Sequence, residues 1–157
     1  MIKVGLGYDV HRLKRGRRFL LAGIELPFPR GEDGHSDGDV LAHAVCDALL
    51  GASALGDIGE LFPPGDPAFK NANSMELLNK VFYLIKDSGW KVINLDCVII
   101  CEAPKVLFFR EEIRKSLSDA LEIPFDCVFI KGKTAEKLGK TGSGKAVEAY
   151  VVCLLEK

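Results

Sequence analysis

A long helix is predicted in the first half of the chain, where residues 35–56 read HSDGDVLAHAVCDALLGASALG. Apolar side chains recur at helical spacing after the capping-box-like pair Ser36 and Asp39, and the helix is expected to end near Gly56. Between residues 40 and 55 the only charged side chain is Asp47. Because a helix with so few charges has little to offer solvent, we expect neighbouring elements to cover it on both sides.

Strands and two further helices are expected around this central helix. Residues 2–11 and 18–26 are rich in β-forming residues and flank a basic turn, which is typical of a hairpin. Further apolar periodicity predicts one helix that starts near Asn73 or Ser74 and another that covers about 105–121. Strands are predicted near 92–101, 126–132 and 146–155. An N-terminal β-hairpin followed by helix–strand units predicts an α+β sandwich, with a mixed β-sheet and three helices packed on one face.

Composition and charge limit the class of protein. The 157 residues include 21 Lys and Arg against 22 Asp and Glu, which gives a formal net charge of -1 at pH 7. This length suits one catalytic domain over residues 1–157, and the apolar content of 48% excludes a disordered chain. The sequence shows neither a membrane-spanning apolar run nor the apolar core of a signal peptide. We therefore expect a cytoplasmic protein with no affinity for membranes or, given its balanced charge, for nucleic acid.

The cysteines are expected to be structural. Their number is odd and they are scattered through apolar segments, which does not indicate a disulfide framework. We interpret them as small buried hydrophobic residues. They are Cys46, Cys97, Cys101, Cys127 and Cys153.

A divalent-metal site is predicted from three residues. Asp9 and His11 point to the same face of a strand, because side chains alternate along it. His43 lies on the predicted helix, one turn from Asp39 and from Asp47. Asp9, His11 and His43 together offer the three ligands that catalytic zinc takes, leaving the fourth position to water or substrate. The alternative is that the histidines are ordinary core or surface residues and that Asp39 only caps the helix.

Two further segments could bind polar ligands. Residues 131–145 combine glycines with lysines, so that many backbone N–H groups could face phosphate oxygens. They are not a P-loop, because Ala146 replaces the Mg²⁺-binding hydroxyl residue and a strand-like segment follows. Asp57, which lies between two glycines, could hold a polyol. An exposed hairpin and a simple turn at the end of the helix are the respective alternatives.

Six segments together resemble the 2-C-methyl-D-erythritol 2,4-cyclodiphosphate synthase family, and the resemblance covers essentially the whole chain. They are GYDVH at 7–11, HSDGD with His43 at 35–43, DALLG at 47–51, GDIG at 56–59, APK at 103–105 and EKLG at 136–139. The resemblance implies a homotrimer with active sites at the subunit interfaces. It also implies that 4-diphosphocytidyl-2-C-methyl-D-erythritol 2-phosphate is converted to 2-C-methyl-D-erythritol 2,4-cyclodiphosphate and CMP, in the non-mevalonate pathway to isoprenoid precursors.

The resemblance also assigns residues to roles. Asp9, His11 and His43 match the ligands of one Zn²⁺ per subunit, and Glu136 matches the ligand of a second divalent ion, Mg²⁺ or Mn²⁺. His35 and Thr134 match the residues that stabilise the transition state. The residues implied in substrate binding are Asp9, Val10, His11, His35, Ser36, Asp57, Ile58, Gly59, Phe62, Asp66, Cys101, Glu102, Ala103, Pro104, Lys105, Val106, Leu107, Lys133, Thr134, Ala135 and Glu136.

The chain departs from the family pattern at four positions. Lys133, Lys140 and Ser143 stand where the family commonly has Thr, Phe and Arg, and Pro64 replaces a residue that is often Asp. Two other functions are considered besides the synthase: a non-catalytic nucleotide- or RNA-binding module built on residues 131–145, and a zinc-dependent phosphoesterase. The first predicts salt-dependent binding without a metal, and the second predicts release of inorganic phosphate.

Overall fold

A five-stranded mixed sheet carries the fold of this computed structural model, which describes all residues from 1 to 157. The strand order is β4-β1-β7-β5-β6; β5 and β6 are parallel, and every other neighbouring pair is antiparallel. The strands are β1 (Ile2–Arg15), β4 (Arg30–Asp33), β5 (Lys91–Ile100), β6 (Val128–Lys133) and β7 (Ala146–Glu156). Two short strands, β2 (Phe19–Leu21) and β3 (Ile24–Leu26), form a separate ribbon.

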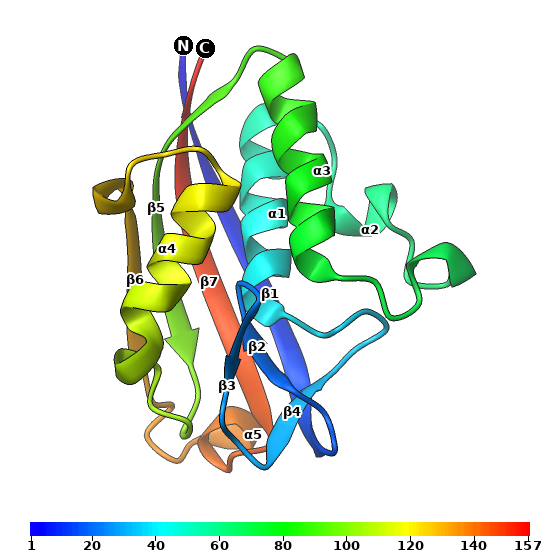
Figure 1. The fold of residues 1–157 in the computed structure, drawn as a ribbon, viewed down its shortest axis with the longest axis vertical. Helices are drawn as coiled ribbons and strands as arrows, with labels where there is room; N and C mark the ends of the chain where they lie inside the picture. Colours follow the sequence, from blue (N-terminus) through cyan, green and yellow to red (C-terminus); the bar gives the residue numbers. More distant parts are fainter.

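Three long helices cover one face of this sheet (Figure 1). They are α1 (Val40–Ser53), α3 (Ser74–Asp87) and α4 (Arg110–Ala120). The remaining helical elements are single turns: α2 (Ile58–Leu61), η1 (Pro67–Phe69), η2 (Val106–Phe109), η3 (Phe125–Cys127) and α5 (Gly139–Gly142). The predicted mixed sheet with three helices on one face is therefore confirmed. No helix has both the length and the apolarity that a membrane crossing needs.

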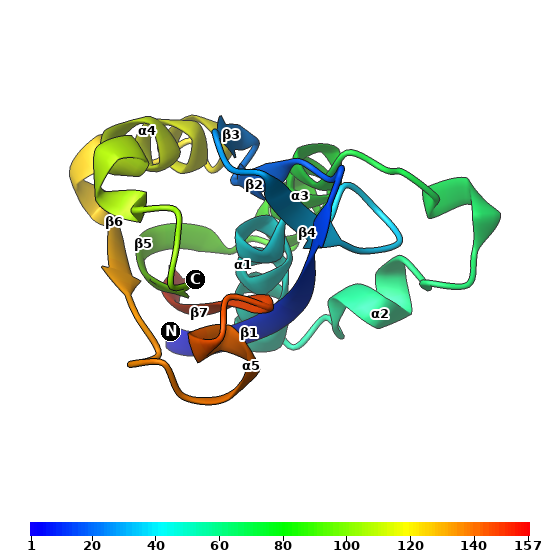
Figure 2. The same cartoon turned by 90° about the horizontal axis from the view of Figure 1, so that it is seen from below.

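Helix α1 lies between the sheet and α3, as its low charge content predicts (Figure 2). Every residue of α1 except His43, Asp47 and Gly51 is buried. The helix approaches β1 so closely that a Cβ atom at Gly7 would lie 1.8 Å from the carbonyl oxygen of Ala44. A Cβ atom at Gly5 would meet the same helix at 1.9 Å. Glycine on β1 is therefore what allows strand and helix backbones to touch.

The N-terminal strand pairs with different segments than the sequence predicts. β1 pairs with β4 around Arg12 and Asp33 and with β7 over most of its length, whereas residues 19–26 pair only with each other. The reason is burial: Phe19, Leu20 and Leu21 are consecutive and all fully buried. A strand on a sheet with one open face buries only alternate residues, so this segment folds inward as its own ribbon.

The start of α1 also differs from the predicted capping box. Asp39 is the N-cap residue and accepts a hydrogen bond from the N–H of Ala42 at 3.0 Å. The hydroxyl of Ser36 instead accepts a hydrogen bond from the N–H of Gly38, at 3.2 Å. Ser36 is thereby free of the helix start and turns toward His43.

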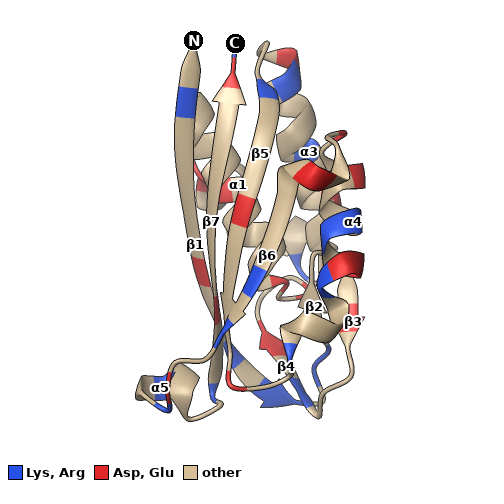
Figure 3. Ribbon diagram, turned by 90° about the vertical axis from the view of Figure 1, so that its left-hand side faces the viewer, with Lys and Arg blue, Asp and Glu red and all other residues tan.

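The face of the sheet away from the helices is largely apolar along β1 and β7, whereas Asp96 on β5 and Lys131 on β6 form an ion pair at 2.6 Å. Figure 3 shows long stretches without charged residues along β1 and β7. The outward side chains of β1 alternate with the buried ones, and several large apolar groups are exposed. These are Ile2, Val4, Leu6, Tyr8 and Val10 on β1, Phe129 on β6, and Tyr150 and Val152 on β7.

Candidate active site

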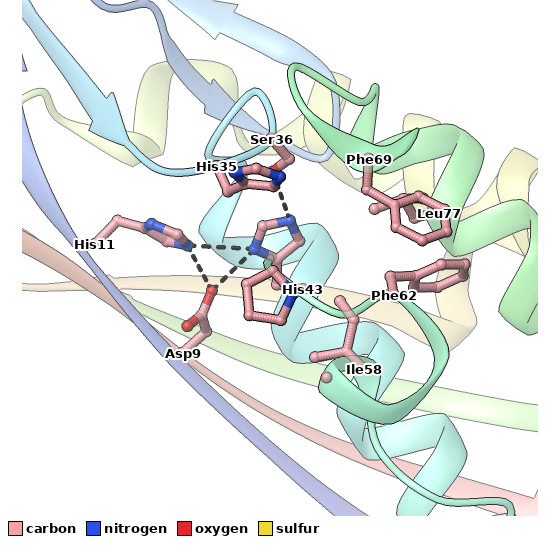
Figure 4. A pocket seen from close by; sticks show the side chains of 11 residues that line it. Asp9, His11, His35, Ser36, His43, Ile58, Phe62, Phe69 and Leu77 are labelled. Atoms are coloured by element: carbon pink, nitrogen blue, oxygen red, sulfur yellow. Dashed lines mark hydrogen bonds and ion pairs between the residues drawn. The ribbon is translucent and has the colours of Figure 1, made fainter. Parts of the chain in front are cut away.

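The predicted metal ligands meet at one point. One ligand atom from each of Asp9, His11 and His43 lies within 4.8 Å of the other two (Figure 4). The Nε2 atom of His11 is 2.7 Å from Oδ2 of Asp9 and 3.2 Å from Nδ1 of His43, which is itself 3.1 Å from Oδ2 of Asp9. Ligand atoms bound about 2.0–2.1 Å from a tetrahedral ion lie about 3.3 Å apart, close to this spacing. The donor set therefore fits a divalent metal ion.

The electrostatics of the three side chains keep Asp9 ionised. Burial disfavours its negative charge, but hydrogen bonds and charge interactions with His11 and His43 outweigh burial and lower the pKa of Asp9 to about 2. The second ring nitrogen of His11, Nδ1, lies 3.3 Å from the backbone carbonyl oxygen of Asp33. With a metal ion bound, an N–H donated there would leave the lone pair of Nε2 for the ion; without the ion, an N–H on Nε2 can donate to Asp9.

A cavity of about 230 Å³ opens beside the triad and gathers many of the residues predicted to bind substrate. Polar groups at one end face an apolar wall that includes Phe62 and Phe69, whose rings meet edge to face with centroids 5.3 Å apart. The lining residues are Asp9, His11, His35, Ser36, His43, Ile58, Gly59, Phe62, Pro64, Phe69 and Leu77. Sequence reasoning missed Pro64, Phe69 and Leu77, because no motif separates such residues from ordinary loop and core positions.

Carboxylates outside the triad hold the walls of this cavity. Asp47 accepts a hydrogen bond from the N–H of Ile58 at 2.8 Å, which ties the start of α2 to α1. Asp57 caps α2 through the N–H of Glu60 at 2.9 Å. Asp66 caps the next turn, and its carbonyl oxygen lies 3.3 Å from Nε2 of His35. The predicted substrate ligands Asp57 and Asp66 thus bind backbone groups of their own loops.

A second cavity, of about 270 Å³, gathers most of the residues predicted to hold the cytidine nucleotide. It lies where β5 and β6 end. Its lining residues are Cys101, Glu102, Pro104, Lys105, Val106, Leu107, Arg110, Gly132, Lys133 and Thr134. Arg110 and Gly132 were not predicted as lining residues. A Cβ atom at Gly132 would lie 3.2 Å from Cβ of Val106, so glycine allows the backbone of β6 to lie close to this side chain.

The loop after β6 is held in a strained conformation. Glu136 and Lys137 are consecutive residues with positive φ angles of 51° and 62°. A carboxylate oxygen of Glu102 accepts hydrogen bonds from the N–H groups of Ala135 at 3.1 Å and Lys137 at 3.2 Å, and Thr134 donates to Glu136 at 2.7 Å. Strain of this kind in non-glycine residues is often associated with functional sites.

The two cavities lie at separate places in one chain. The metal triad stands on β1 and α1, whereas Thr134 and Glu136 follow β6, and strands β7 and β5 lie between. Glu136 is accordingly not part of the triad. Val10 belongs to neither cavity, since it alternates with Asp9 and His11 and lines a different hollow with Arg12 and Lys140.

Comparison with known proteins accounts for nearly the whole chain. Over 154 residues it is 56% identical to the 2-C-methyl-D-erythritol 2,4-cyclodiphosphate synthase of Treponema denticola, a match that spans 98% of this chain and 96% of that protein. The protein of the same name from Chlorobium phaeovibrioides is 47% identical over 156 residues, covering 99% of both chains.

Solved structures agree with these relatives. A 2C-methyl-D-erythritol-2,4-cyclodiphosphate synthase in its CDP-bound form has a TM-score of 0.90 and 38% identity, covering 98% of this chain and all of that one (100%). The bifunctional IspDF of Campylobacter jejuni has a TM-score of 0.95 and 39% identity; the match spans 99% of this chain and 42% of that longer chain. Since residues 2–156 also match the model of the YgbB family, the chain belongs to the YgbB family.

Proposed function

We propose that this chain is a lyase that converts 4-diphosphocytidyl-2-C-methyl-D-erythritol 2-phosphate to 2-C-methyl-D-erythritol 2,4-cyclodiphosphate and CMP. The reaction belongs to the non-mevalonate pathway to isoprenoid precursors. The observation that carries the proposal is the convergence of Asp9, His11 and His43 beside a cavity. The relatives at 47–56% identity carry the name of this enzyme.

The reaction needs no nucleophile from the protein. An oxygen of the substrate's 2-phosphate forms a bond to the β-phosphorus, while the bond from that phosphorus to the oxygen bridging the two phosphates breaks. CMP leaves with the bridging oxygen, and no water is consumed. The chain must therefore position two anionic groups against each other and exclude water. A divalent ion, when bound, neutralises phosphate charge during the displacement.

The residues around the first cavity have different roles in this reaction. We assign Asp9, His11 and His43 to one Zn²⁺, because a carboxylate and two imidazoles are typical zinc ligands. His35, at the rim, is positioned to contact the phosphate groups in the transition state. The apolar wall of Ile58, Phe62, Phe69 and Leu77 suits the carbon skeleton of methylerythritol and keeps water away.

We further propose that the active unit is a homotrimer whose sites form between subunits. In one chain the triad and the second cavity are separated by two strands, so a substrate that carries both cytidine and methylerythritol phosphate needs a neighbour to complete the site. The apolar outer face of the sheet supplies a surface that a second copy could cover. In this arrangement Thr134 and Glu136, with a second ion, Mg²⁺ or Mn²⁺, approach the triad of the adjacent subunit. Residues 1–157 would act as a single catalytic domain in the cytoplasm.

The first experiment is ³¹P NMR of the purified protein with the proposed substrate, Zn²⁺ and Mg²⁺. Two coupled resonances of a cyclic diphosphate, formed with equimolar CMP, are expected. The His43→Ala variant should lose both zinc and activity. Inorganic phosphate as the product would instead indicate a phosphoesterase, and an unchanged spectrum from zinc-loaded protein would refute the proposed reaction.

A subunit-mixing experiment tests the shared site. The His43→Ala variant retains the second cavity, and the Thr134→Ala variant retains the metal triad. Mixing the two inactive proteins under conditions that exchange subunits should restore part of the activity. In randomly mixed trimers about one quarter of the interfaces combine an intact triad with an intact Thr134 from the neighbouring subunit. Mixtures as inactive as their components, although subunits exchange, would show that each site lies within one chain.

A further inference from the structure

Two serine hydroxyls meet the outer ring nitrogen of His43. The Nε2 atom of His43 lies 2.8 Å from Oγ of Ser74 and 3.1 Å from Oγ of Ser36, while Nδ1 faces the other two triad residues (Figure 4). Ser74 is fully buried at the first position of α3. Its side chain has no other function in the helix, because Asn73 is the residue that caps α3.

The carboxylate of Asp37 sets the direction of these hydrogen bonds. The hydroxyl of Ser74 donates to Oδ1 of Asp37, and the N–H of Ser74 donates to Oδ2 at 3.0 Å. An ionised carboxylate can only accept, so the hydroxyl proton of Ser74 is committed to Asp37. The lone pairs of the Ser74 oxygen then remain to accept hydrogen bonds, and the nitrogen 2.8 Å away is Nε2 of His43. An N–H on Nε2 that donates to this oxygen leaves the lone pair of Nδ1 on the side of Asp9 and His11, where a metal ion would bind.

We propose that Asp37 and Ser74 are positioning residues that fix the tautomer and the ring orientation of His43 for metal binding. This inference rests on the metal site proposed above. Metal-bound histidines generally donate their other N–H to a carboxylate, carbonyl or water, and losing that partner typically costs about 10- to 100-fold in metal affinity or activity. His11 has the backbone carbonyl of Asp33 for this purpose. His43 is linked to the carboxylate of Asp37 through the hydroxyl of Ser74.

The chain of hydrogen bonds from Asp37 through Ser74 to His43, called the relay below, also joins three separate parts of the chain. Asp37 lies in the loop before α1, Ser74 begins α3, and His43 lies on α1. The backbone supports the same geometry, since the N–H of Asp37 donates to the carbonyl oxygen of Ala72 at 3.0 Å. Ser74→Ala therefore removes the side-chain bonds to His43 and Asp37 but keeps the bonds donated by the backbone N–H groups of Ser74 and Asp37, which hold the loop.

The test measures zinc affinity of the metal-free, full-length protein by competition with a chelator. Ser74→Ala removes the bond to His43 and should weaken Zn²⁺ binding about 10- to 100-fold. Ser74→Thr keeps a hydroxyl and should restore affinity to within about threefold of the original. Asn73→Ala is the matched control: it removes the helix cap, which accepts from the N–H of Met75 at 2.9 Å, and does not touch His43. It should lower thermal stability while leaving zinc affinity unchanged.

Ring ¹⁵N NMR of the metal-free protein gives a second readout that needs neither zinc nor activity. The fraction of His43 protonated on Nε2 should be higher in the original protein and in Ser74→Thr than in Ser74→Ala, which lacks the accepting hydroxyl oxygen. If Ser74→Ala folds poorly, Ser74→Cys keeps the volume with a weaker acceptor and should give an intermediate loss of affinity.

Unchanged zinc affinity in Ser74→Ala, or an equal loss in Asn73→Ala, would overturn the relay. Zinc binding that survives in His43→Ala would instead refute the metal-site assignment itself, so the two failures are distinguishable.

Discussion

Replacing Gly7 by Ala should weaken the fold and the metal site together. A Cβ atom at this position would lie 1.8 Å from the carbonyl oxygen of Ala44 and 2.8 Å from its carbonyl carbon. Both atoms belong to the backbone of α1, so no side-chain rotation can relieve the clash. Because carbon–oxygen contacts are normally about 3.3 Å or longer, β1 and α1 must separate by roughly 1.5 Å.

The cost follows from this displacement. Overpacking a core costs about 1–3 kcal/mol, and we expect the upper end because two backbones must move. For a chain of this size each kcal/mol corresponds to about 2–4 °C, so Tm should fall by about 6–12 °C. Gly7 lies two residues before Asp9, and Ala44 directly follows His43. Since metal–ligand bonds of about 2.0–2.1 Å tolerate little misplacement, zinc affinity should fall at least about tenfold.

The assay compares Gly7→Ala with Gly51→Ala, by thermal unfolding of the metal-free proteins and by zinc titration. Gly51 lies on the exposed side of the same helix, and nothing is within 4 Å of its added Cβ atom. Ala should stabilise that position by about 0.5–1 kcal/mol, because glycine is unfavourable inside a helix. An unchanged Tm in Gly7→Ala would refute the close packing of strand and helix. A lowered Tm with unchanged zinc affinity would refute their coupling to the metal site.

Three further predictions concern groups outside the triad. Burial, with the nearby charge of Asp39, raises the pKa of Glu32 from 4.5 to about 9, so the folded state holds a proton that the unfolded state loses. The free energy of unfolding should therefore fall with rising pH by about 1.4 kcal/mol per pH unit between pH 5 and 9, relative to the Glu32→Gln variant. Urea titrations at each pH measure this, and the same pH dependence of unfolding free energy in both proteins would contradict it. Burial also raises the thiol pKa values of Cys101 to about 12 and of Cys153 to about 11. Brief labelling with iodoacetamide at pH 8, followed by mass spectrometry, should therefore find the half-buried Cys127 modified first. Early labelling of Cys101 would contradict this. Lys137→Gly should raise the free energy of unfolding by roughly 1 kcal/mol, because a left-handed backbone is unfavourable for L-residues; a decrease in urea unfolding would show that the lysine side chain contributes more than the strain costs.

The metal triad could be predicted because short-range geometry fixes most of it. Alternation along β1 places Asp9 and His11 on one face whatever the rest of the chain does. Bringing His43 to them requires α1 to lie on β1, and the scarcity of charge on that helix already indicated a buried position. The separation of the two cavities could not be predicted in this way. It depends on strand order, in which β6 and β7 are consecutive in sequence yet lie apart with β5 between them.

The acidic residues near α1 show why residue type alone does not identify a metal ligand. Asp39 is fully buried, but its oxygens accept hydrogen bonds from the N–H groups of Ala22, Gly23 and Ala42, at 2.6 to 3.0 Å. Asp47 is similarly engaged by backbone at the start of α2. Both carboxylates thus hold backbone N–H groups of neighbouring segments in place. Asp9 differs because the side-chain partners of its carboxylate are two imidazoles. Two imidazole nitrogens and a carboxylate oxygen that face one another satisfy their electrostatics best around a shared cation, so the identity of the hydrogen-bond partners, rather than acidity or burial, distinguishes the ligand from the scaffold.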